Sequence, residues 1–163
     1  MKKLSKIIAT AFGAGYLPVA PGTAGAVVGI VMLWGIHQLY FSFNTAATGF
    51  WMIFAVLLLL LLLGGVWATD QLESEWGKDP SKVVMDEVVG VWIAMFLIPF
   101  TNWNLVFAFI LFRIFDIWKP LGIRKLEAIK GGWGVMLDDV LAGVYANIVL
   151  HLGIWILSQQ SIG

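Results

Sequence analysis

The sequence predicts an all-α membrane protein with about five transmembrane or partly re-entrant helices and an interfacial helix at its N-terminus. The chain has 163 residues, of which 60% are hydrophobic, compared with roughly 45–50% in soluble domains. Residues 50–69, FWMIFAVLLLLLLLGGVWAT, form an uncharged run about as long as the ~20 residues that span the hydrocarbon core. The ten Lys and Arg residues lie in groups, and the connections that alternate with these groups carry no charge. This alternation is typical of a chain that crosses the membrane several times.

The first element that we expect is a short interfacial helix in the N-terminal stretch MKKLSKIIATAFGAG, where three lysines precede apolar residues. A secretory signal peptide is the competing interpretation. It is disfavoured because residues 13–21 interrupt the apolar run and no convincing cleavage site follows.

Five apolar segments then follow at about residues 25–40, 50–69, 88–100, 105–118 and 140–157. The third and fourth segments are short and are separated by only four residues. They form either a tilted pair or a hairpin that does not fully cross the membrane. We find no internal repeat and no linker, so the sequence predicts a single polytopic domain over residues 1–163.

The positions of the charged residues indicate that the reactive site lies on one side of the membrane. Every Lys and Arg belongs to the same side, which the positive-inside rule makes cytoplasmic, and the ten acidic residues share that side. The N-terminus is then inside and the C-terminus outside. A transport pathway would need polar groups at several depths, whereas the outer half is bare. This pattern favours chemistry at the inner interface.

Two acidic pairs, Asp86–Glu87 and Asp138–Asp139, border the third and fifth segments. Small residues continue the helix face of one acid in each pair: Gly90 and Ala94 after Asp86, and Ala142, Gly143 and Ala146 after Asp139. Small residues let membrane helices approach closely, so packing of these two faces would bring the carboxylates together.

Crowded carboxylates repel, and an all-oxygen cluster suits Mg²⁺ or Mn²⁺, which would offset that repulsion. The alternative is that each pair only stabilises a helix N-terminus. Because both acidic pairs are followed by a helix face of small residues, we favour a metal site over capping.

A second group of candidate residues is basic. Arg113, Asp116 and Lys119 follow at intervals of three near the end of the fourth segment, just before Pro120. Lys130 and the glycines Gly131 and Gly132 lead into the second acidic pair. Cationic side chains and backbone N–H groups of a glycine-rich loop can hold phosphate, although such glycines also mark tight turns.

The remaining motifs carry less information about chemistry. In PVAPGTAG, Thr23 is either an N-cap in a rigid turn or a substrate contact. His37 and His151 lie away from the acids and are interpreted as structural. The chain has no cysteine and no Asp-x-Asp-x-Thr pattern, so covalent routes of phosphate hydrolysis lack their residues. The route that remains is attack by water activated by a metal ion.

Four stretches, AFGAGYLPVAPGTAG, KDPSKVVMDEVVG, FRIFDIWKP and KGGWGVMLDDVLAG, resemble the phosphatidylglycerophosphatase A family in the family's order. The resemblance runs from near the N-terminus to about residue 150. It departs from the family pattern at Ala26, where a small hydroxyl residue is expected, and at Gly122, where a second proline is expected. The resemblance implies an Mg²⁺-dependent phosphatase of the bacterial inner membrane. Such an enzyme removes the terminal phosphate of phosphatidylglycerophosphate and leaves phosphatidylglycerol.

Residues and resemblance together give one hypothesis: a Mg²⁺-dependent lipid phosphatase at the cytoplasmic membrane interface, acting in the bilayer and without nucleic acid as a partner. The expected metal ligands are Asp79, Asp86, Glu87, Asp138 and Asp139, and the last four are also the expected catalytic residues. The expected substrate-binding residues are Thr23, Arg113, Asp116, Lys119, Lys130, Gly131 and Gly132. The alternatives are a phosphatase for another lipid phosphate and a non-enzymatic, cation-binding transporter subunit. The oligomeric state stays open.

Overall fold

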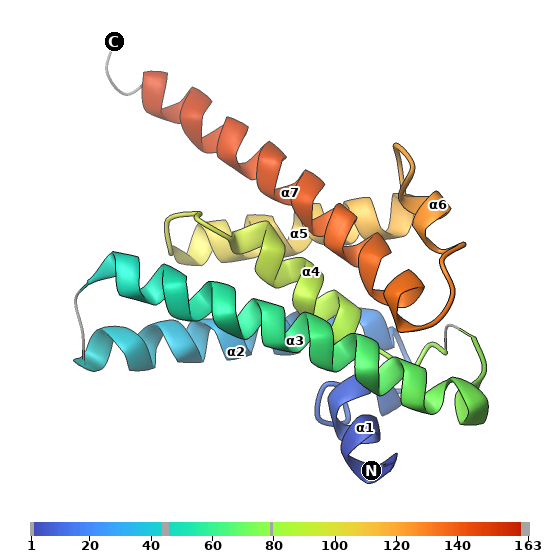
Figure 1. The fold of residues 1–163 in the computed structure, drawn as a ribbon. Helices are drawn as coiled ribbons and strands as arrows, with labels where there is room; N and C mark the ends of the chain where they lie inside the picture. Colours follow the sequence, from blue (N-terminus) through green and yellow to red (C-terminus); the bar gives the residue numbers. More distant parts are fainter. Residues whose placement is uncertain (1, 44–45, 79, 161–163) are drawn as a thin grey trace.

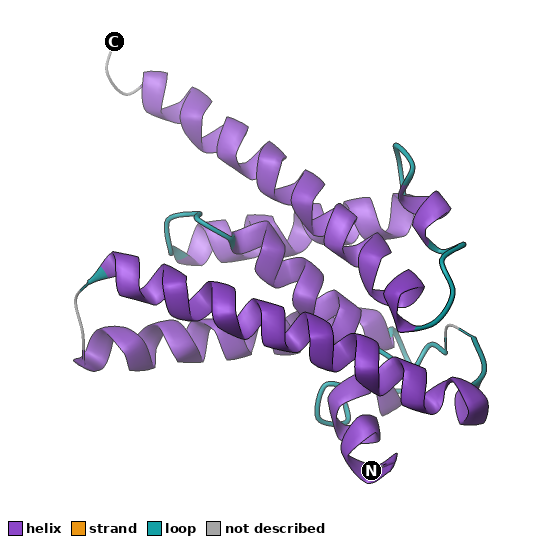
Figure 2. Cartoon of the chain, viewed as in Figure 1, coloured by secondary structure: helices purple, strands orange, loops and turns teal. Residues whose placement is uncertain are grey.

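The computed structural model describes residues 2–43, 46–78 and 80–160 (Figure 1). All regular secondary structure in these residues is helical (Figure 2), which confirms the predicted class. The elements are α1 (Lys2–Ala9), the short 3₁₀ helix η1 (Ala14–Tyr16), α2 (Pro21–Phe43), α3 (Ala47–Trp76), α4 (Met85–Met95), α5 (Asn102–Trp118), α6 (Ile123–Leu126) and α7 (Gly132–Gln160).

Three helices, α2, α3 and α7, are long and apolar enough to cross a membrane. The other two expected segments are shorter. With 11 and 17 residues, α4 and α5 measure about 16 and 25 Å at 1.5 Å per residue, less than the ~30 Å of the hydrocarbon core. The prediction that this pair is short is confirmed, and the count of about five crossing segments stays a prediction.

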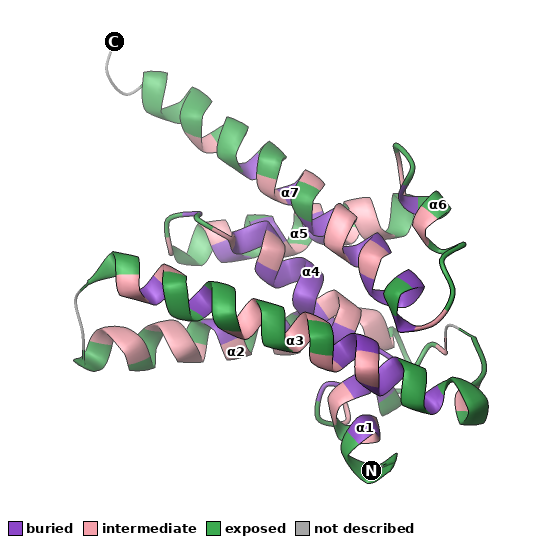
Figure 3. Ribbon diagram, in the orientation of Figure 1, coloured by how far each residue is buried: buried purple, intermediate pink, exposed green. Residues whose placement is uncertain are grey.

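The short helix α4 is the centre of the molecule. It packs against α2, α3, α5 and α7, and eight of its 11 residues are buried (Figure 3). The apolar faces of the long helices point outward instead, with large exposed side chains such as Val31, Leu60 and Leu152. An apolar exterior of this kind is suited to lipid rather than to water.

Helices α4 and α7 approach so closely that glycine is required at their crossing. A Cβ atom on Gly143 would lie 2.4 Å from the carbonyl oxygen of Gly90, and a Cβ on Gly90 would lie 2.9 Å from the carbonyl oxygen of Asp139. The predicted packing of the two small-residue faces is therefore confirmed. Helix α2 uses Gly25 and Gly29 in the same way against α4.

The far end of α4 stops inside the protein and is closed by a side chain from α7. The amide nitrogen Nδ2 of Asn147 donates hydrogen bonds to the carbonyl oxygens of Ala94, at 3.1 Å, and Phe96, at 2.8 Å. These bonds satisfy carbonyl groups that a helix C-terminus leaves without partners. Next to them, Leu97 adopts a left-handed backbone conformation, with φ of 59°, that turns the chain toward α5.

The N-terminal helix α1 has the amphipathic form expected of an interfacial helix. Its Lys6 pairs with Glu75 near the end of α3, while Leu4 and Ile7 are exposed. The expected N-cap role of Thr23 is wrong, because α2 begins two residues earlier, at Pro21, after Ala20 in a left-handed conformation with φ of 48°. A proline fits the first turn of a helix, since its missing N–H would have no partner there.

Candidate active site

Three carboxylates meet at the end of the molecule where α4 and α7 begin. Asp86 and Glu87 lie in the first turn of α4, and Asp139 lies two turns into α7. Each offers one oxygen, and the three oxygens lie within 4.8 Å of one another. The meeting of Asp86 and Asp139 was predicted from the helix faces, and the glycine crossing described above produces it.

The helix-capping alternative does not hold for the second acidic pair. The sequence predicted a helix from about residue 140, which would have put Asp138 and Asp139 at its start. The observed α7 begins at Gly132 and has no acidic residue in its first turn, so both side chains are buried beside the inner turns of the helix. Asp86 does lie in a first turn, and one of its oxygens accepts the N–H of Glu87 at 3.1 Å.

The electrostatics of the cluster favour a bound cation. Burial, followed by the neighbouring Glu87 carboxylate, raises the pKa of Asp86 well above its ordinary value. One oxygen of Glu87, Oε2, is buried without a hydrogen-bond partner among the described residues. Asp116 on α5 adds a fourth carboxylate beside Asp139 and Glu87. An anionic set of oxygen donors with an unused buried oxygen fits a hard divalent cation.

One of the expected metal ligands, Asp138, is placed differently, and another, Asp79, is not among the described residues. Asp138 does not belong to the group of three, because its Oδ2 accepts a hydrogen bond from Lys119 instead. Asp86, Glu87 and Asp139 are therefore the ligands that the geometry supports.

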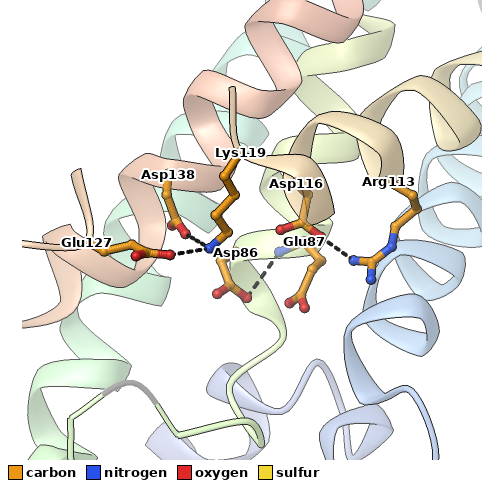
Figure 4. Close-up of polar contacts among 7 residues, drawn as sticks. All are labelled: Asp86, Glu87, Arg113, Asp116, Lys119, Glu127 and Asp138. Carbon is orange, nitrogen blue, oxygen red and sulfur yellow. Dashed lines mark hydrogen bonds and ion pairs between the residues drawn. The ribbon is translucent and has the colours of Figure 1, made fainter. Parts of the chain in front are cut away.

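The predicted basic residues flank the carboxylates. The Nη1 atom of Arg113 donates to Oδ2 of Asp116 at 2.6 Å, one helix turn away (Figure 4). The Nε atom of the same guanidinium is buried and has no partner among the described residues. Arg113 therefore lies fixed beside the carboxylates and has one N–H donor without a partner among the described residues.

Lys119 is held on the other side of the cluster. Its ammonium group donates to Glu127 at 2.6 Å and to Asp138 at 2.7 Å (Figure 4). Burial lowers the pKa of Lys119, but its bonds to these two carboxylates outweigh burial and raise the pKa above the ordinary value. Lys119 ends α5 in a left-handed backbone conformation, with φ of 48°, which is uncommon for a residue other than glycine.

The glycine-rich loop has a different partner from the expected anion. The backbone N–H of Gly132 donates to Oδ1 of Asp70 at 2.5 Å, so this donor is already used within the chain. Lys130 is exposed, and Gly131 lies next to the side chain of Asp70. Asp70 thereby stabilises the start of α7, and the expected phosphate contact of Gly131 and Gly132 stays a prediction.

Three residues near the site were missed by sequence reasoning: Gly22, Asp70 and Glu127. A Cβ atom on Gly22 would lie 2.1 Å from Oε1 of Glu87 and 3.3 Å from Nη1 of Arg113, so this glycine borders the site where Thr23 was expected. The Pro-Gly-Thr stretch was a usable signal for it. Asp70 and Glu127 had no signal, since Asp70 meets Gly132 at a separation of 62 residues and Glu127 meets Lys119 through the turn after α5.

Comparison with known proteins agrees with this geometry. The model of the family described as phosphatidylglycerophosphatase A matches residues 7–154. A Bacteroides thetaiotaomicron protein named "putative phosphatidylinositol-3-phosphatase" is 49% identical over 157 residues, covering 94% of this chain and 96% of the relative. No solved structure matches the chain.

Two relatives carry the name phosphatidylglycerophosphatase A. The Escherichia coli protein is 32% identical over 148 residues, which is 89% of this chain and 80% of the relative. The Haemophilus influenzae protein is 36% identical over 166 residues, 96% of each chain. These matches argue against the transporter-subunit alternative, and the chain belongs to the phosphatidylglycerophosphatase A family of phosphatases.

Proposed function

We propose that this phosphatase hydrolyses phosphatidylglycerophosphate to phosphatidylglycerol and phosphate, uses Mg²⁺, and acts at the cytoplasmic face of the bacterial inner membrane. The observation that carries the proposal is the group of three carboxylates, Asp86, Glu87 and Asp139, with Arg113 and Lys119 beside it. The two family relatives with this name support the choice of substrate.

Asp86, Glu87 and Asp139 would hold the cation, with Asp116 close enough to join them or to orient Arg113. A bound Mg²⁺ would polarise the phosphoryl oxygens and lower the pKa of water at the site.

Arg113 and Lys119 would bind the non-bridging oxygens of the phosphate. An ammonium group has three N–H donors, of which Glu127 and Asp138 take two, so one can point to the substrate. The Nε of Arg113 offers a second donor from the opposite side. Donors fixed before the substrate arrives stabilise the charge that develops in the transition state without reorganising.

The site's position suits a lipid substrate. The first turn of α4, the end of α5 and the start of α7 meet at one end of the long helices (Figure 1). A headgroup phosphate can reach this end while the acyl chains stay in the bilayer.

The one-sided distribution of Lys and Arg supports a cytoplasmic orientation. Reporter fusions after Gly77 and Leu126 should then report the cytoplasm, and a fusion after Asn102 the opposite side.

Hydrolysis of phosphatidylinositol 3-phosphate is a second candidate. It is favoured by the Bacteroides relative, which is 49% identical and covers nearly the whole chain. Both lipids carry a terminal phosphomonoester on a headgroup alcohol, so the same carboxylates and cations would serve either one.

The test is phosphate release by the purified protein from vesicles that contain phosphatidylglycerophosphate, phosphatidylinositol 3-phosphate or phosphatidic acid, with Mg²⁺ or with EDTA. We expect Mg²⁺-dependent release and a kcat/KM highest for phosphatidylglycerophosphate. A higher kcat/KM for the inositol lipid would select the second candidate. Phosphate release that is insensitive to EDTA would rule out a role for Mg²⁺. Calorimetric titration of Mg²⁺ into the lipid-free protein measures metal binding independently of activity.

A further inference from the structure

A small recess lies beside the carboxylate cluster, between the end of α3, the loop after α6 and the start of α7. Its lining includes Thr69, Glu73, Lys78, Glu127 and Asp138. The space open to the centre of a water molecule measures about 20 Å³. Since about 10–15 Å³ is enough for one water molecule, the recess holds roughly one or two atoms of that size.

Two residues of this lining each have a buried side-chain oxygen atom with no hydrogen-bond partner among the described residues. These atoms are Oγ1 of Thr69 and Oδ1 of Asp138, on residues that are only 4% and 7% exposed. A threonine hydroxyl in a helix usually bonds to a carbonyl oxygen one turn back, as Thr10 does to Lys6 at 2.7 Å. Leaving such groups unpaired is unfavourable, so a ligand group should complete them.

The chemistry of the lining selects a neutral hydroxyl group. Glu73, Glu127 and Asp138 would repel an anion. A divalent cation is also disfavoured, because Lys78 lines the recess and Lys119 already occupies Asp138 and Glu127. Among the described residues, the carboxylates that converge as metal ligands are those of Asp86, Glu87 and Asp139. A hydroxyl group can donate to Oδ1 of Asp138 and accept from Oγ1 of Thr69.

The recess and the carboxylate cluster are joined through neighbouring residues of α7. Asp138 lines it, while the next residue, Asp139, belongs to the carboxylate cluster. Lys119, a proposed phosphate ligand, is bonded to the other oxygen of Asp138. A group bound here would therefore be attached close to the phosphorus atom.

We propose that the recess formed by Thr69 and Asp138 binds the hydroxyl group on the carbon next to the phosphate ester of the substrate. The inference rests on the proposed lipid phosphatase function. Glycerol and inositol headgroups both present such a neighbouring hydroxyl, whereas phosphatidic acid carries an acyl ester there. A site built to hydrogen-bond a hydroxyl group discriminates against substrates that lack it, because its own polar groups are then left unpaired.

The test compares phosphatidylglycerophosphate with an analogue in which propane-1,3-diol replaces the headgroup glycerol and only the neighbouring hydroxyl is missing. The parent protein should hydrolyse the analogue with kcat/KM at least about tenfold lower. Thr69→Val should lower kcat/KM for the natural lipid about five- to tenfold and leave that for the analogue unchanged. Thr69→Ser, which keeps the hydroxyl, should retain the preference of the parent. Thr48→Val makes the same change at an exposed position of α3 and should alter neither substrate.

The outcomes separate the inference from the function on which it rests. Equal hydrolysis of both lipids by the parent, or an equal loss on both in Thr69→Val, overturns the hydroxyl site and leaves the phosphatase intact. A recess that holds only water gives this result. No hydrolysis of any lipid phosphate overturns the proposed function itself. If Thr69→Val loses activity only on phosphatidylinositol 3-phosphate, the site is supported and the hydroxyl is that of inositol.

Discussion

Replacing Gly143 by alanine should disable the site from a distance, without touching any proposed ligand. The added Cβ would lie 2.4 Å from the carbonyl oxygen of Gly90 and 3.0 Å from Cβ of Ile93, both on α4. The first distance is about 1 Å short of the 3.4 Å at which ordinary contact begins. The nearest obstacle is a backbone carbonyl group, and Cβ of Ile93 does not move when its side chain rotates, so α4 and α7 must separate.

The separation acts directly on the carboxylates, because Asp139 lies one turn before Gly143 and Asp86 one turn before Gly90. Moving catalytic groups by about 1 Å can reduce turnover about a hundredfold. Overpacking should also destabilise the fold by about 1–3 kcal/mol. We therefore expect kcat/KM to fall about a hundredfold and the apparent affinity for Mg²⁺ to weaken.

The assay is Mg²⁺-dependent phosphate release in detergent, read beside thermal unfolding of the same sample. Gly153→Ala is the matched control, since it lies on the same helix with no atom within 4 Å of the added Cβ. It should keep full activity and stabilise α7 slightly, by up to about 1 kcal/mol. Activity in Gly143→Ala equal to that of Gly153→Ala would show that the glycine crossing does not set the distance between the carboxylates.

Three further predictions concern the site itself. Asp86→Asn and Asp139→Asn should each abolish Mg²⁺-dependent phosphate release while the protein still inserts and purifies; if the acids only stabilise helix ends, each variant should lose about 1 kcal/mol of stability and keep its activity. Arg113→Lys should lower kcat/KM at least about tenfold, because an ammonium group cannot replace a planar guanidinium held by Asp116; unchanged kinetics would make Arg113 a membrane anchor. Gly22→Ala should weaken Mg²⁺ binding in calorimetry, because its Cβ would meet Oε1 of Glu87 at 2.1 Å; unaltered binding would mean that this carboxylate can swing aside at no loss.

The parts of the site that sequence could predict are those that helical spacing controls. The intervals from Asp86 to Gly90 and from Asp139 to Gly143 put an acid and a glycine on one helix face, and two such faces have a physical reason to pack. The three-residue interval between Arg113 and Asp116 likewise predicted neighbours on α5, and the two side chains are bonded.

Contacts made across loops could not be predicted from the sequence. Whether Lys119 would bind phosphate oxygens alone or also hold Asp138 and Glu127 depends on the turn after α5, where Lys119 and Leu121 both have positive φ. The start of α7 was placed eight residues late, because the glycines of residues 131–134 read as a loop. In the structure Asp70 supplies the hydrogen bond that lets the helix begin there.

The two hydrogen bonds from Asn147 to the end of α4 have a consequence for the order of membrane assembly. Asn147 belongs to α7, which leaves the ribosome after the other described helices, so the carbonyl groups of Ala94 and Phe96 lack this partner while those helices insert. Unpaired carbonyl groups are unfavourable in hydrocarbon. We therefore expect the hairpin of α4 and α5 to stay near the interface or the insertion machinery until α7 arrives. Labelling of position 97 in nascent chains of increasing length would follow this step. The active site would then form only after α7 has been made, so a chain that ends before α7 could not hydrolyse lipid.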